Sequence, residues 1–330
     1  MTNANSDVFF TVIIPTRNRP ELFKLALDSV LSQSFKSIEV VVANDGTTDE
    51  FLPAYKALEK EYGDNIHWRY QIRRVNGHGQ SYSMNTGAYV GKGKYLCFLD
   101  DDDYWIDNEH LQRAYDSIVN SPAPVDAYYT NQDAYFSDGS KQTQNVWVED
   151  LANKIHSLPQ DAQGSASVDA AFLFTSGGFA HLNCTIVRRD LYLTIKGMDE
   201  NIRYECDRDI YIRTVDAAEN ILYNPAVISK HHIPDPKKSD NMSTLVSTFE
   251  KRLYQITVYE KAILLSNKPS IKQHSKIGLA NIFKHITEEY VRLNQLTDAA
   301  IYAKKALALN FSVKWYLYSS YLSVISTFKG

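Results

Sequence analysis

The sequence has 330 residues, of which 44% are hydrophobic and 22% are charged, and its formal net charge at pH 7 is −4. These values are typical of a globular protein large enough for one substantial α/β domain and an appendage, and they exclude a disordered chain. No run approaches the roughly 18 consecutive apolar residues of a membrane-spanning helix.

The charge is divided unevenly along the chain. Residues 1–235 carry 21 Lys and Arg against 33 Asp and Glu, whereas residues 236–330 carry 14 against 6. We therefore expect an acidic domain followed by a basic module. The basic module either meets an anionic surface or partner, or docks on the acidic domain. No stripe interleaves Lys and Arg with aromatic residues, so nucleic acid is not an expected partner.

The cysteines bear on the compartment. Cys97, Cys184 and Cys206 are widely spaced and odd in number, and none forms a CxxC pair. This pattern predicts neither a disulfide framework nor a zinc site and indicates a reducing compartment. The first seven residues are polar, so a signal peptide is not expected. We predict a cytoplasmic protein, either free or peripheral to the inner face of a membrane.

Apolar runs and helical periodicities alternate along the first hundred residues. Strands are predicted at 8–14, 38–43, 66–72 and 95–99, and helices at 20–33, 47–62 and 80–90. Such an alternation predicts a parallel sheet with right-handed crossovers. Because ligands bind at the carboxyl ends of strands in such sheets, the polar residues that follow three of these strands are expected on one rim. They are Thr16–Arg17, Asn44–Asp45 and Asp100–Asp103.

The run Asp100–Asp103 is the most informative stretch of the chain. Four adjacent carboxylates beside a buried strand repel one another unless a cation or hydrogen-bond donors neutralise them. A divalent ion would do so, and a diphosphate could complete its shell. The alternative is that one Asp caps a helix predicted at 108–120 and the others are solvated. One cap needs one carboxylate, so we favour the metal. Neither a G-x-G-x-x-G fingerprint nor a Walker A motif offers another phosphate site.

Further strands are predicted at 125–131, 182–187 and 221–228, and an amphipathic helix is entered through Tyr204–Asp209. Between them, residues 137–170 lack periodicity and are rich in polar residues and Gly. An irregular stretch of this length is typical of a functional lid or a mobile insert.

The remainder of the chain is helical in pattern. Helices are predicted at 240–266, 270–293, 296–309 and 311–328, and residues 293–310 resemble one tetratricopeptide-type helix pair. The last helix carries two adjacent apolar stripes, which either pack on the other helices or contact a membrane or partner. The first stripe is Phe311, Trp315, Tyr318, Leu322 and Ile325, and the second is Leu317, Tyr321, Val324 and Phe328.

Four motifs occur in one order along the chain, at Pro15–Asn18, Asn44–Asp49, Phe98–Trp105 and Gly197–Asp209. In this combination, over residues 8–235, the chain resembles the family 2 glycosyltransferases. The resemblance implies a GT-A fold, an α/β fold with a Rossmann-like mixed, mostly parallel sheet flanked by helices, here followed by an α-helical C-terminal region at 236–330.

The resemblance also implies an activity. It is inverting transfer of a hexosyl or N-acetylhexosaminyl group from a nucleotide diphosphate sugar, with a UDP-sugar favoured, aided by Mn²⁺ or Mg²⁺. The acceptor would be a hydroxyl of a glycan or of a lipid-linked molecule, in the synthesis of a surface polysaccharide.

Several residues match the family's donor site. Asp45 resembles the carboxylate that bonds the donor base, and Pro15 and Thr16 line the same pocket, with Arg17 next to them. Asn85 matches an asparagine that we group with the donor-binding residues.

The acidic motifs match positions around the diphosphate and the acceptor. Asp102 matches the metal ligand, and Asp100 and Asp101 match the ribose and water-mediated positions. His232 is similar to a histidine that closes over the diphosphate or metal. Asp207 resembles the general base, which would deprotonate the acceptor hydroxyl for in-line attack on the anomeric carbon.

The chain departs from the family at two positions. Met84 stands where an arginine often precedes the asparagine, and Arg17, Arg73 or Arg74 could replace that charge. Cys206 stands where a glutamate often precedes the base, which puts the support of the base in doubt.

Structural readings of the same residues remain open. Asp207 could be a first-turn acid favoured by a helix dipole, Asp45 part of a tight turn, and His232 a surface residue at a strand end. An alternative function is a catalytically decayed GT-A scaffold that serves as a binding module, against which the intact aspartates argue.

Overall fold

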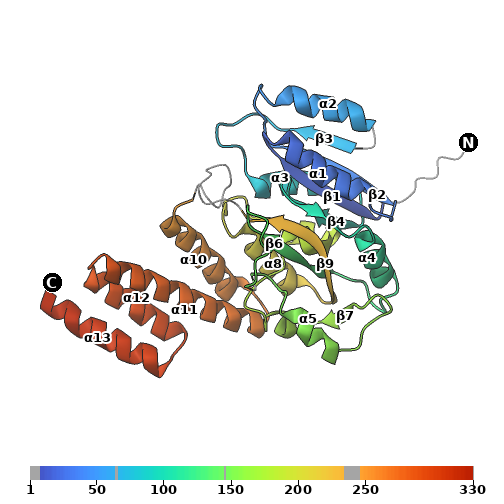
Figure 1. The fold of residues 1–330 in the computed structure, drawn as a ribbon. Helices are drawn as coiled ribbons and strands as arrows, with labels where there is room; N and C mark the ends of the chain where they lie inside the picture. Colours follow the sequence, from blue (N-terminus) through green and yellow to red (C-terminus); the bar gives the residue numbers. More distant parts are fainter. Residues whose placement is uncertain (1–7, 64–65, 145, 234–245, 330) are drawn as a thin grey trace, which may run out of the picture. The chain divides into compact units, whose positions relative to one another are not determined.

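The computed structural model describes residues 8–63, 66–144, 146–233 and 246–329. The chain divides into two compact units, Met1–Thr244 and Leu245–Gly330. The first is a sheet flanked by helices and the second is helical (Figure 1). Among the described residues, no helix has both the length and the hydropathy needed to cross a bilayer.

The sheet of the first unit has nine strands and is mixed. Their order across the sheet is β3 (Ile66–Tyr70), β2 (Ile38–Asn44), β1 (Phe10–Thr16), β4 (Tyr95–Phe98), β8 (Thr185–Arg188), β6 (Ala127–Tyr135), β9 (Ile221–His232) and β5 (Tyr104–Trp105), with β7 (Ala166–Val168) paired to β9. The expected parallel rhythm holds from β1 to β4. It then stops, because β8 enters between β4 and β6 antiparallel to both.

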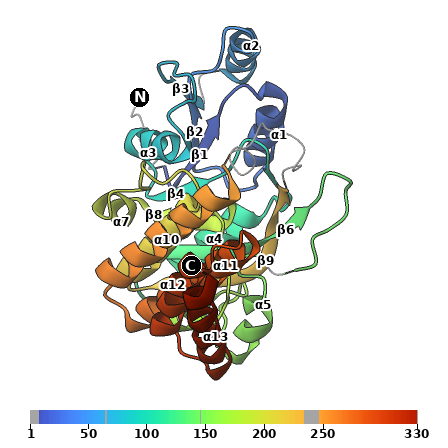
Figure 2. The same ribbon diagram turned by 90° about the vertical axis from the view of Figure 1, so that its left-hand side faces the viewer.

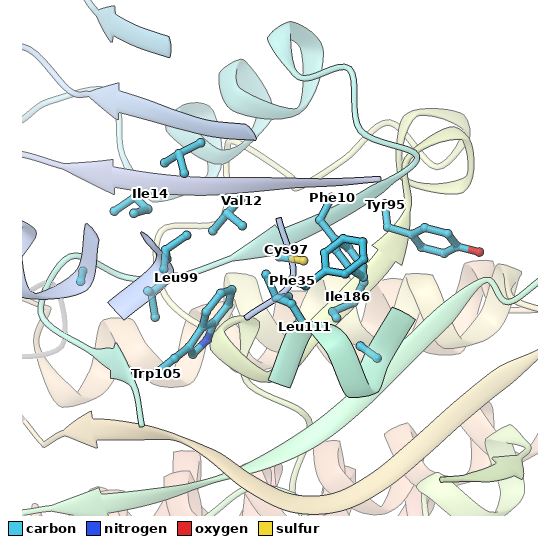
Figure 3. Close-up of a cluster of buried hydrophobic side chains, with 14 of the residues drawn as sticks. Phe10, Val12, Ile14, Phe35, Tyr95, Cys97, Leu99, Trp105, Leu111 and Ile186 are labelled. Carbon is cyan, nitrogen blue, oxygen red and sulfur yellow. The ribbon is translucent and has the colours of Figure 1, made fainter. Parts of the chain in front are cut away.

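Helices cover both faces of this sheet. Alternate side chains of β1 and β4 pack with α1 (Pro20–Leu31), α2 (Leu52–Tyr62) and α4 (His110–Val119) on one face. Figure 3 shows this cluster, with Phe10, Val12 and Ile14 beside Cys97 and Leu99. On the other face α3 (Gln80–Val90) lies so close to β1 that a Cβ on Gly87 would collide with Ile13. Strand β1 is thus buried on both sides, as its unbroken apolar run predicts.

The other face also carries α7 (Arg189–Thr194) and α8 (Cys206–Ala217). The rings of Tyr192 on α7 and Phe98 on β4 lie 5.5 Å apart, and those of Tyr211 on α8 and Tyr129 on β6 lie 5.3 Å apart. These contacts hold α7 against β4 and α8 against β6.

Among the boundaries that differ from the sequence predictions are the start of α2 and the end of β9. The predicted helix start at residue 47, from a capping-box pattern at Thr47 and Glu50, was wrong, because α2 begins only at Leu52. The amide of Thr47 instead donates to Asn44 Oδ1 at 3.0 Å, and that of Thr48 donates to Asn18 Oδ1 at 2.9 Å. These bonds tie the segment after β2 to the end of β1. Strand β9 extends beyond the predicted end at residue 228 to His232, so His231 and His232 both lie within the sheet.

The irregular stretch 137–170 is partly ordered into α5 (Leu151–Lys154), a 3₁₀ turn (Ile155–Ser157) and β7. Next along the chain come α6 (Ala170–Leu173) and a second 3₁₀ turn (Leu182–Cys184).

The second unit consists of α10 (Thr248–Leu265), α11 (Pro269–Arg292), α12 (Leu296–Leu309) and α13 (Val313–Lys329). Each packs against the next along the chain, and they can be followed in orange and red in Figure 2. Helix α10 begins with a capping box between Ser247 and Glu250. One stripe of α13 packs on α12, with Leu322 1% exposed against Ala299 and Ala303.

The packing of α13 separates the two predicted stripes. Trp315, Tyr318, Leu322 and Ile325 belong to the cluster with α12. The second stripe is exposed, as is Phe311 of the first. The first stripe, except for Phe311, therefore packs on another helix of the unit, which was one of the two predicted interpretations.

Candidate active site

Asp103 anchors the aspartate run. Its side chain is fully buried and accepts hydrogen bonds from Asn183 Nδ2 at 2.5 Å and from the His232 amide at 2.8 Å. His231 Nδ1 lies 2.7 Å from Asp103 Oδ2, the oxygen that also accepts from Asn183. Burial alone would raise the pKa of Asp103, but the charge and hydrogen bond of His231 hold it below its ordinary value. The pair fixes the end of β9 against the loop after β4.

Asp101 is held by Arg19, a residue that the sequence analysis did not select. Arg19 Nη2 lies 2.6 Å from Asp101 Oδ1, and its Nη1 donates to Asp102 Oδ2 at 2.8 Å. Thr16 Oγ1 donates to the other oxygen of Asp101 at 2.7 Å. Burial nevertheless outweighs Arg19 and raises the pKa of Asp101 to about 7. The signal in the sequence was the position of Arg19, one residue before the helix-starting Pro20.

Asp100 is the least compensated of the four. Gln80 Nε2 donates to its Oδ1 at 2.7 Å. Burial, and next the negative charge of Asp207 and of the neighbouring aspartates, raise its pKa well above the ordinary value. The carboxamide of Gln80 also reaches the thiol of Cys206, which donates to Gln80 Oε1 at 3.4 Å. Gln80 therefore links the aspartate run to the start of α8.

Asp207 lies beside this run, although more than 100 residues separate them in the sequence. It occupies the first turn of α8. This helix begins directly after Glu205, whose backbone is left-handed with φ 66°. A single imidazole, that of His181, spans the gap. Its Nε2 lies 3.3 Å from Asp207 Oδ2 and 3.9 Å from Asp100 Oδ2. The structure thus brings the predicted base and the predicted diphosphate side together.

The two histidines at the end of β9 differ in their environment. Burial would lower the pKa of His231, but Asp103 outweighs it and raises the pKa. His232 is 45% exposed in its side chain, and its Nδ1 lies 2.8 Å from the carbonyl oxygen of Asp102. Because that carbonyl can only accept, Nδ1 is the donor of this hydrogen bond.

The predicted donor residues on β1 and β2 are bound mainly to the chain itself. Asp45 accepts hydrogen bonds from the amides of His78 and Gly79 at 2.8 and 2.9 Å, and the ring of His78 lies 2.7 Å from Asp45 Oδ1. Arg17 Nη2 donates to the carbonyl oxygens of Arg74 and Val75. Asp45 and Arg17 therefore shape the turn between β3 and α3. Pro15, half-buried, is the last residue but one of β1.

Asn85 is placed apart from these residues and is fully hydrogen-bonded. Its Nδ2 donates to the Met198 carbonyl and to Glu200 Oε1, both at 2.9 Å. Its Oδ1 accepts from the Met198 amide at 2.9 Å and from the Tyr192 hydroxyl at 2.8 Å. The side chain is buried and holds the loop 197–200 that leads to α8. Of the arginines considered as replacements for the missing charge, Arg73 is paired with Asp49 at 3.3 Å.

Among the residues that the structure describes, two groups of side chains could hold a metal ion, with ligand atoms within 4.8 Å of one another: Asp100, Asp102 and Asp103, and Asp103, His181 and His231. The first group offers only carboxylate oxygens, which suit Mg²⁺ and Mn²⁺. Burial, and next the negative charge of the neighbouring carboxylates, raises the pKa of Asp100, and a hard divalent cation would offset that charge, so this group fits one.

The second group fits a metal less well. The amide of Asn183 donates to His181 Nδ1 at 3.3 Å, which leaves the proton of that ring on Nε2. The Nε2 atom is the one that faces the acids, so it has no free lone pair to give.

Comparisons with known proteins bear on the family and on the fold. The family model described as glycosyl transferase family 2 matches residues 11–192. The chain is 36% identical to glycosyltransferase GlyA of Streptococcus pneumoniae over 115 residues, which are 35% of this chain and 16% of GlyA. It is 27% identical to amylovoran biosynthesis glycosyltransferase AmsB of Erwinia amylovora over 210 residues, 63% of this chain and 64% of AmsB. The matched parts thus span less than two-thirds of either relative.

Two solved structures are similar in fold. TarS 1–349 of S. aureus in complex with UDP-GlcNAc has a TM-score of 0.64 at 17% identity, over 90% of this chain and 81% of that chain. The mannosyltransferase PcManGT of Pyrobaculum calidifontis, in complex with GDP-Man and Mn²⁺, has a TM-score of 0.58 at 17% identity, over 95% of this chain and 84% of that chain. At this identity the likeness shows the fold.

Proposed function

The chain belongs to glycosyl transferase family 2, and we propose that it is an inverting, metal-dependent enzyme that uses a nucleotide diphosphate sugar, with a UDP-sugar favoured. The group transferred is a hexosyl or N-acetylhexosaminyl residue, and the acceptor is a hydroxyl of a glycan or lipid-linked molecule in surface polysaccharide synthesis. TarS in complex with UDP-GlcNAc supports the choice of donor, and the name of AmsB supports the pathway.

One observation carries the proposal: Asp207 and the run Asp100–Asp103 face one site, with His181 3.3 Å from the first and 3.9 Å from the second. Inverting transfer needs a base on the acceptor side and charge compensation on the diphosphate side, a few ångströms apart. A decayed scaffold would have no reason to keep a poorly compensated set of acids there.

The residues of this chain supply the acid–base chemistry. Asp207 takes the proton of the acceptor hydroxyl while that oxygen bonds to the anomeric carbon and the bond to the nucleoside diphosphate breaks. The start of α8 holds Asp207 at the acceptor side, and Asn85 supports the loop that precedes α8. We place Pro15, Thr16, Arg17 and Asp45 at the wall of the pocket for the donor base.

The metal side rests on the acids and one histidine. A bound Mn²⁺ or Mg²⁺ would be held by Asp102, beside Asp100 and Asp103 and with His232 at the rim, and would offset the charge of the departing diphosphate. PcManGT in complex with Mn²⁺ supports this assignment. Asp101, paired with Arg19 and Thr16, keeps the loop in shape, and we assign it, with Asp100, to the donor ribose side.

We further propose that the protein works at the inner face of the cytoplasmic membrane, with α13 in peripheral contact. The second stripe of α13 is exposed along its length, from 56% at Val324 to 84% at Phe328. An exposed apolar helix face on a unit with excess positive charge suits an anionic lipid surface, where a lipid-linked acceptor would be found.

A thermal-shift panel tests the proposed function. UDP-, GDP- and dTDP-sugars are added with Mn²⁺, and only the true donor should raise the melting temperature strongly. Hydrolysis of that donor with metal separates an enzyme from a scaffold. Stabilisation by no nucleotide sugar, or binding without turnover, would contradict the proposal.

A further inference from the structure

His181 is a buried histidine that none of the family motifs identifies. It lies at the end of the segment 176–181, directly before the 3₁₀ turn Leu182–Cys184, and is 7% exposed. The ring nitrogen that faces the acids is Nε2, which lies 3.3 Å from Asp207 Oδ2 and 3.9 Å from Asp100 Oδ2. A polar ring enclosed between two carboxylates of a catalytic site needs an account beyond packing.

The tautomer of the ring follows from its other nitrogen. The backbone amide of Asn183 donates to His181 Nδ1 at 3.3 Å. A nitrogen that accepts a hydrogen bond carries no proton, so the ring is neutral. A neutral ring that accepts at Nδ1 carries its proton on Nε2, and this nitrogen lies 3.3 Å from Asp207 Oδ2.

The ring is also held in place. Its centroid lies 5.7 Å from that of Trp147, edge to face, and 5.1 Å from that of His231. The His181 carbonyl accepts from Thr185 Oγ1 at 2.9 Å. The side chain of Asn183 is fixed in turn, because its Oδ1 accepts from the Asp100 amide and its Nδ2 donates to Asp103. One asparagine therefore sets both the aspartate run and the orientation of His181.

Building on the proposed function, we propose that His181 is a positioning residue for the base Asp207. Its Nε2–H holds Oδ2 of Asp207, so that Oδ1 is turned to the acceptor hydroxyl. Oδ1 of Asp207 accepts from the thiol of Cys206 at 3.5 Å. A thiol is a weak donor, so it does not block this oxygen. A neutral donor orients the carboxylate without neutralising it, which a cation in the same place would do.

This role fills the place that the sequence left in doubt. Where Cys206 replaces the glutamate that often precedes the base, the support for Asp207 comes instead from a histidine 26 positions earlier, brought in by β8. A metal ligand role for His181 does not fit, since the nitrogen that faces the acids is the protonated one.

Two variants and one spectrum test the proposal. Gln places an amide N–H near the position of His Nε2–H, whereas Leu fills the space without a donor. We expect His181→Leu to lower kcat by roughly 10–100-fold while KM for the donor stays within about 2-fold of wild type, and His181→Gln to recover most of the loss. The melting temperatures of both variants show whether they are folded. ¹⁵N-histidine spectra, with the His181 signals assigned by their loss in His181→Gln, should show protonated Nε2 and unprotonated Nδ1.

The outcomes separate this inference from the proposed function. An active wild type with equal kcat in His181→Leu, or with equal losses in the Leu and Gln variants, overturns the positioning role and leaves the proposed function standing. A protonated Nδ1 in the spectra overturns it independently of any activity. Absence of sugar transfer by the wild type with every donor overturns both.

Discussion

Arg19 forms a salt bridge with Asp101 of the aspartate run, with 2.6 Å between Arg19 Nη2 and Asp101 Oδ1. Asp101 is 2% exposed, and burial would leave its charge uncompensated without this partner. Arg19 thus compensates the charge of Asp101 and also reaches Asp102, whereas no Lys or Arg of the described residues forms a salt bridge with Asp100. Four residues that are identical in the sequence therefore differ in how the protein compensates their charge.

The first prediction concerns this pair. Arg19→Met should lower the free energy of unfolding by about 3 kcal/mol at pH 8, measured by urea denaturation. Because the pKa of Asp101 is already raised to about 7, its ionisation opposes folding as the pH rises from 4 to 7. Loss of Arg19 should extend that fall to higher pH. Arg73→Met removes an exposed pair with Asp49 and should change stability by less than about 0.5 kcal/mol. Equal stability of Arg19→Met and wild type would contradict the prediction.

The second prediction concerns the base. Asp207→Asn should lower turnover by roughly 10²–10⁴-fold, because the amide cannot take the acceptor proton, while donor affinity stays near wild type. Steady-state kinetics and a donor titration measure the two. Asp209, two residues along α8, is buried against Arg213 at 2.8 Å and serves as the control. Asp209→Asn should lower stability with little effect on the turnover of folded protein. Unchanged turnover in Asp207→Asn would remove it from the role.

The third prediction concerns the metal. EDTA should abolish transfer, and Mn²⁺ or Mg²⁺ should restore it, because the acids need a cation to bind a diphosphate. Mn²⁺ alone should raise the melting temperature of the wild type, and Asp102→Asn should lose most of that shift and at least about 10-fold in metal affinity. Asp133→Asn is the control, because it removes a salt bridge between Asp133 on β6 and Lys141. Full activity in chelator would be decisive against a metal.

The fourth prediction concerns His110, at the start of α4. The side chain is 1% exposed, and neither ring nitrogen has a hydrogen-bond partner within the described part of the chain. Burial lowers its pKa to about 3. Below about pH 6.5 the unfolded chain therefore binds a proton that the folded protein does not, so stability falls as the pH falls, by about 2 kcal/mol between pH 8 and pH 5.

His110→Phe should remove this contribution, and the ring can keep its edge-to-face contact with Trp105. The difference in unfolding free energy between variant and wild type should grow in favour of the variant from pH 8 to pH 5. His285→Gln, at a half-exposed site on α11, should show no such trend. Parallel pH profiles for wild type and His110→Phe would disprove the assignment.

The fifth prediction concerns α13. Replacement of Leu317, Tyr321 and Val324 by Ser removes most of the exposed stripe without touching the side that packs on α12. Partition onto vesicles with anionic lipids should fall by about 10-fold or more, since each buried apolar side chain contributes 1.5–3 kcal/mol at most. Leu264→Ser, at a residue of α10 that is 77% exposed, is the matched control. Equal sedimentation of all three proteins with vesicles would rule out membrane contact through α13.

Much of the fold follows from local pattern. The apolar runs of β1, β2 and β4 and the helical periods of α1 and α3 lie within a few positions of where the sequence predicts them, because burial on both faces or on one face is written in neighbouring residues. The failed start of α2 shows the limit of local pattern. Thr47 and Thr48 have capping chemistry, but their amides are taken by asparagines at the ends of β1 and β2.

What the sequence by itself determined was the alternation of elements, the order of the four family motifs and the presence of an acidic run at a strand end. The tertiary structure decided which groups those acids meet. Asp103 finds His231 128 positions away, and Asp100 shares Asn183 with a histidine that then faces Asp207. No local pattern encodes such pairs, because β8 enters the sheet between strands that neither precede nor follow it directly. The charge state of a buried carboxylate depends on those distant neighbours, so the chemistry of the site is set by topology rather than by the motif alone.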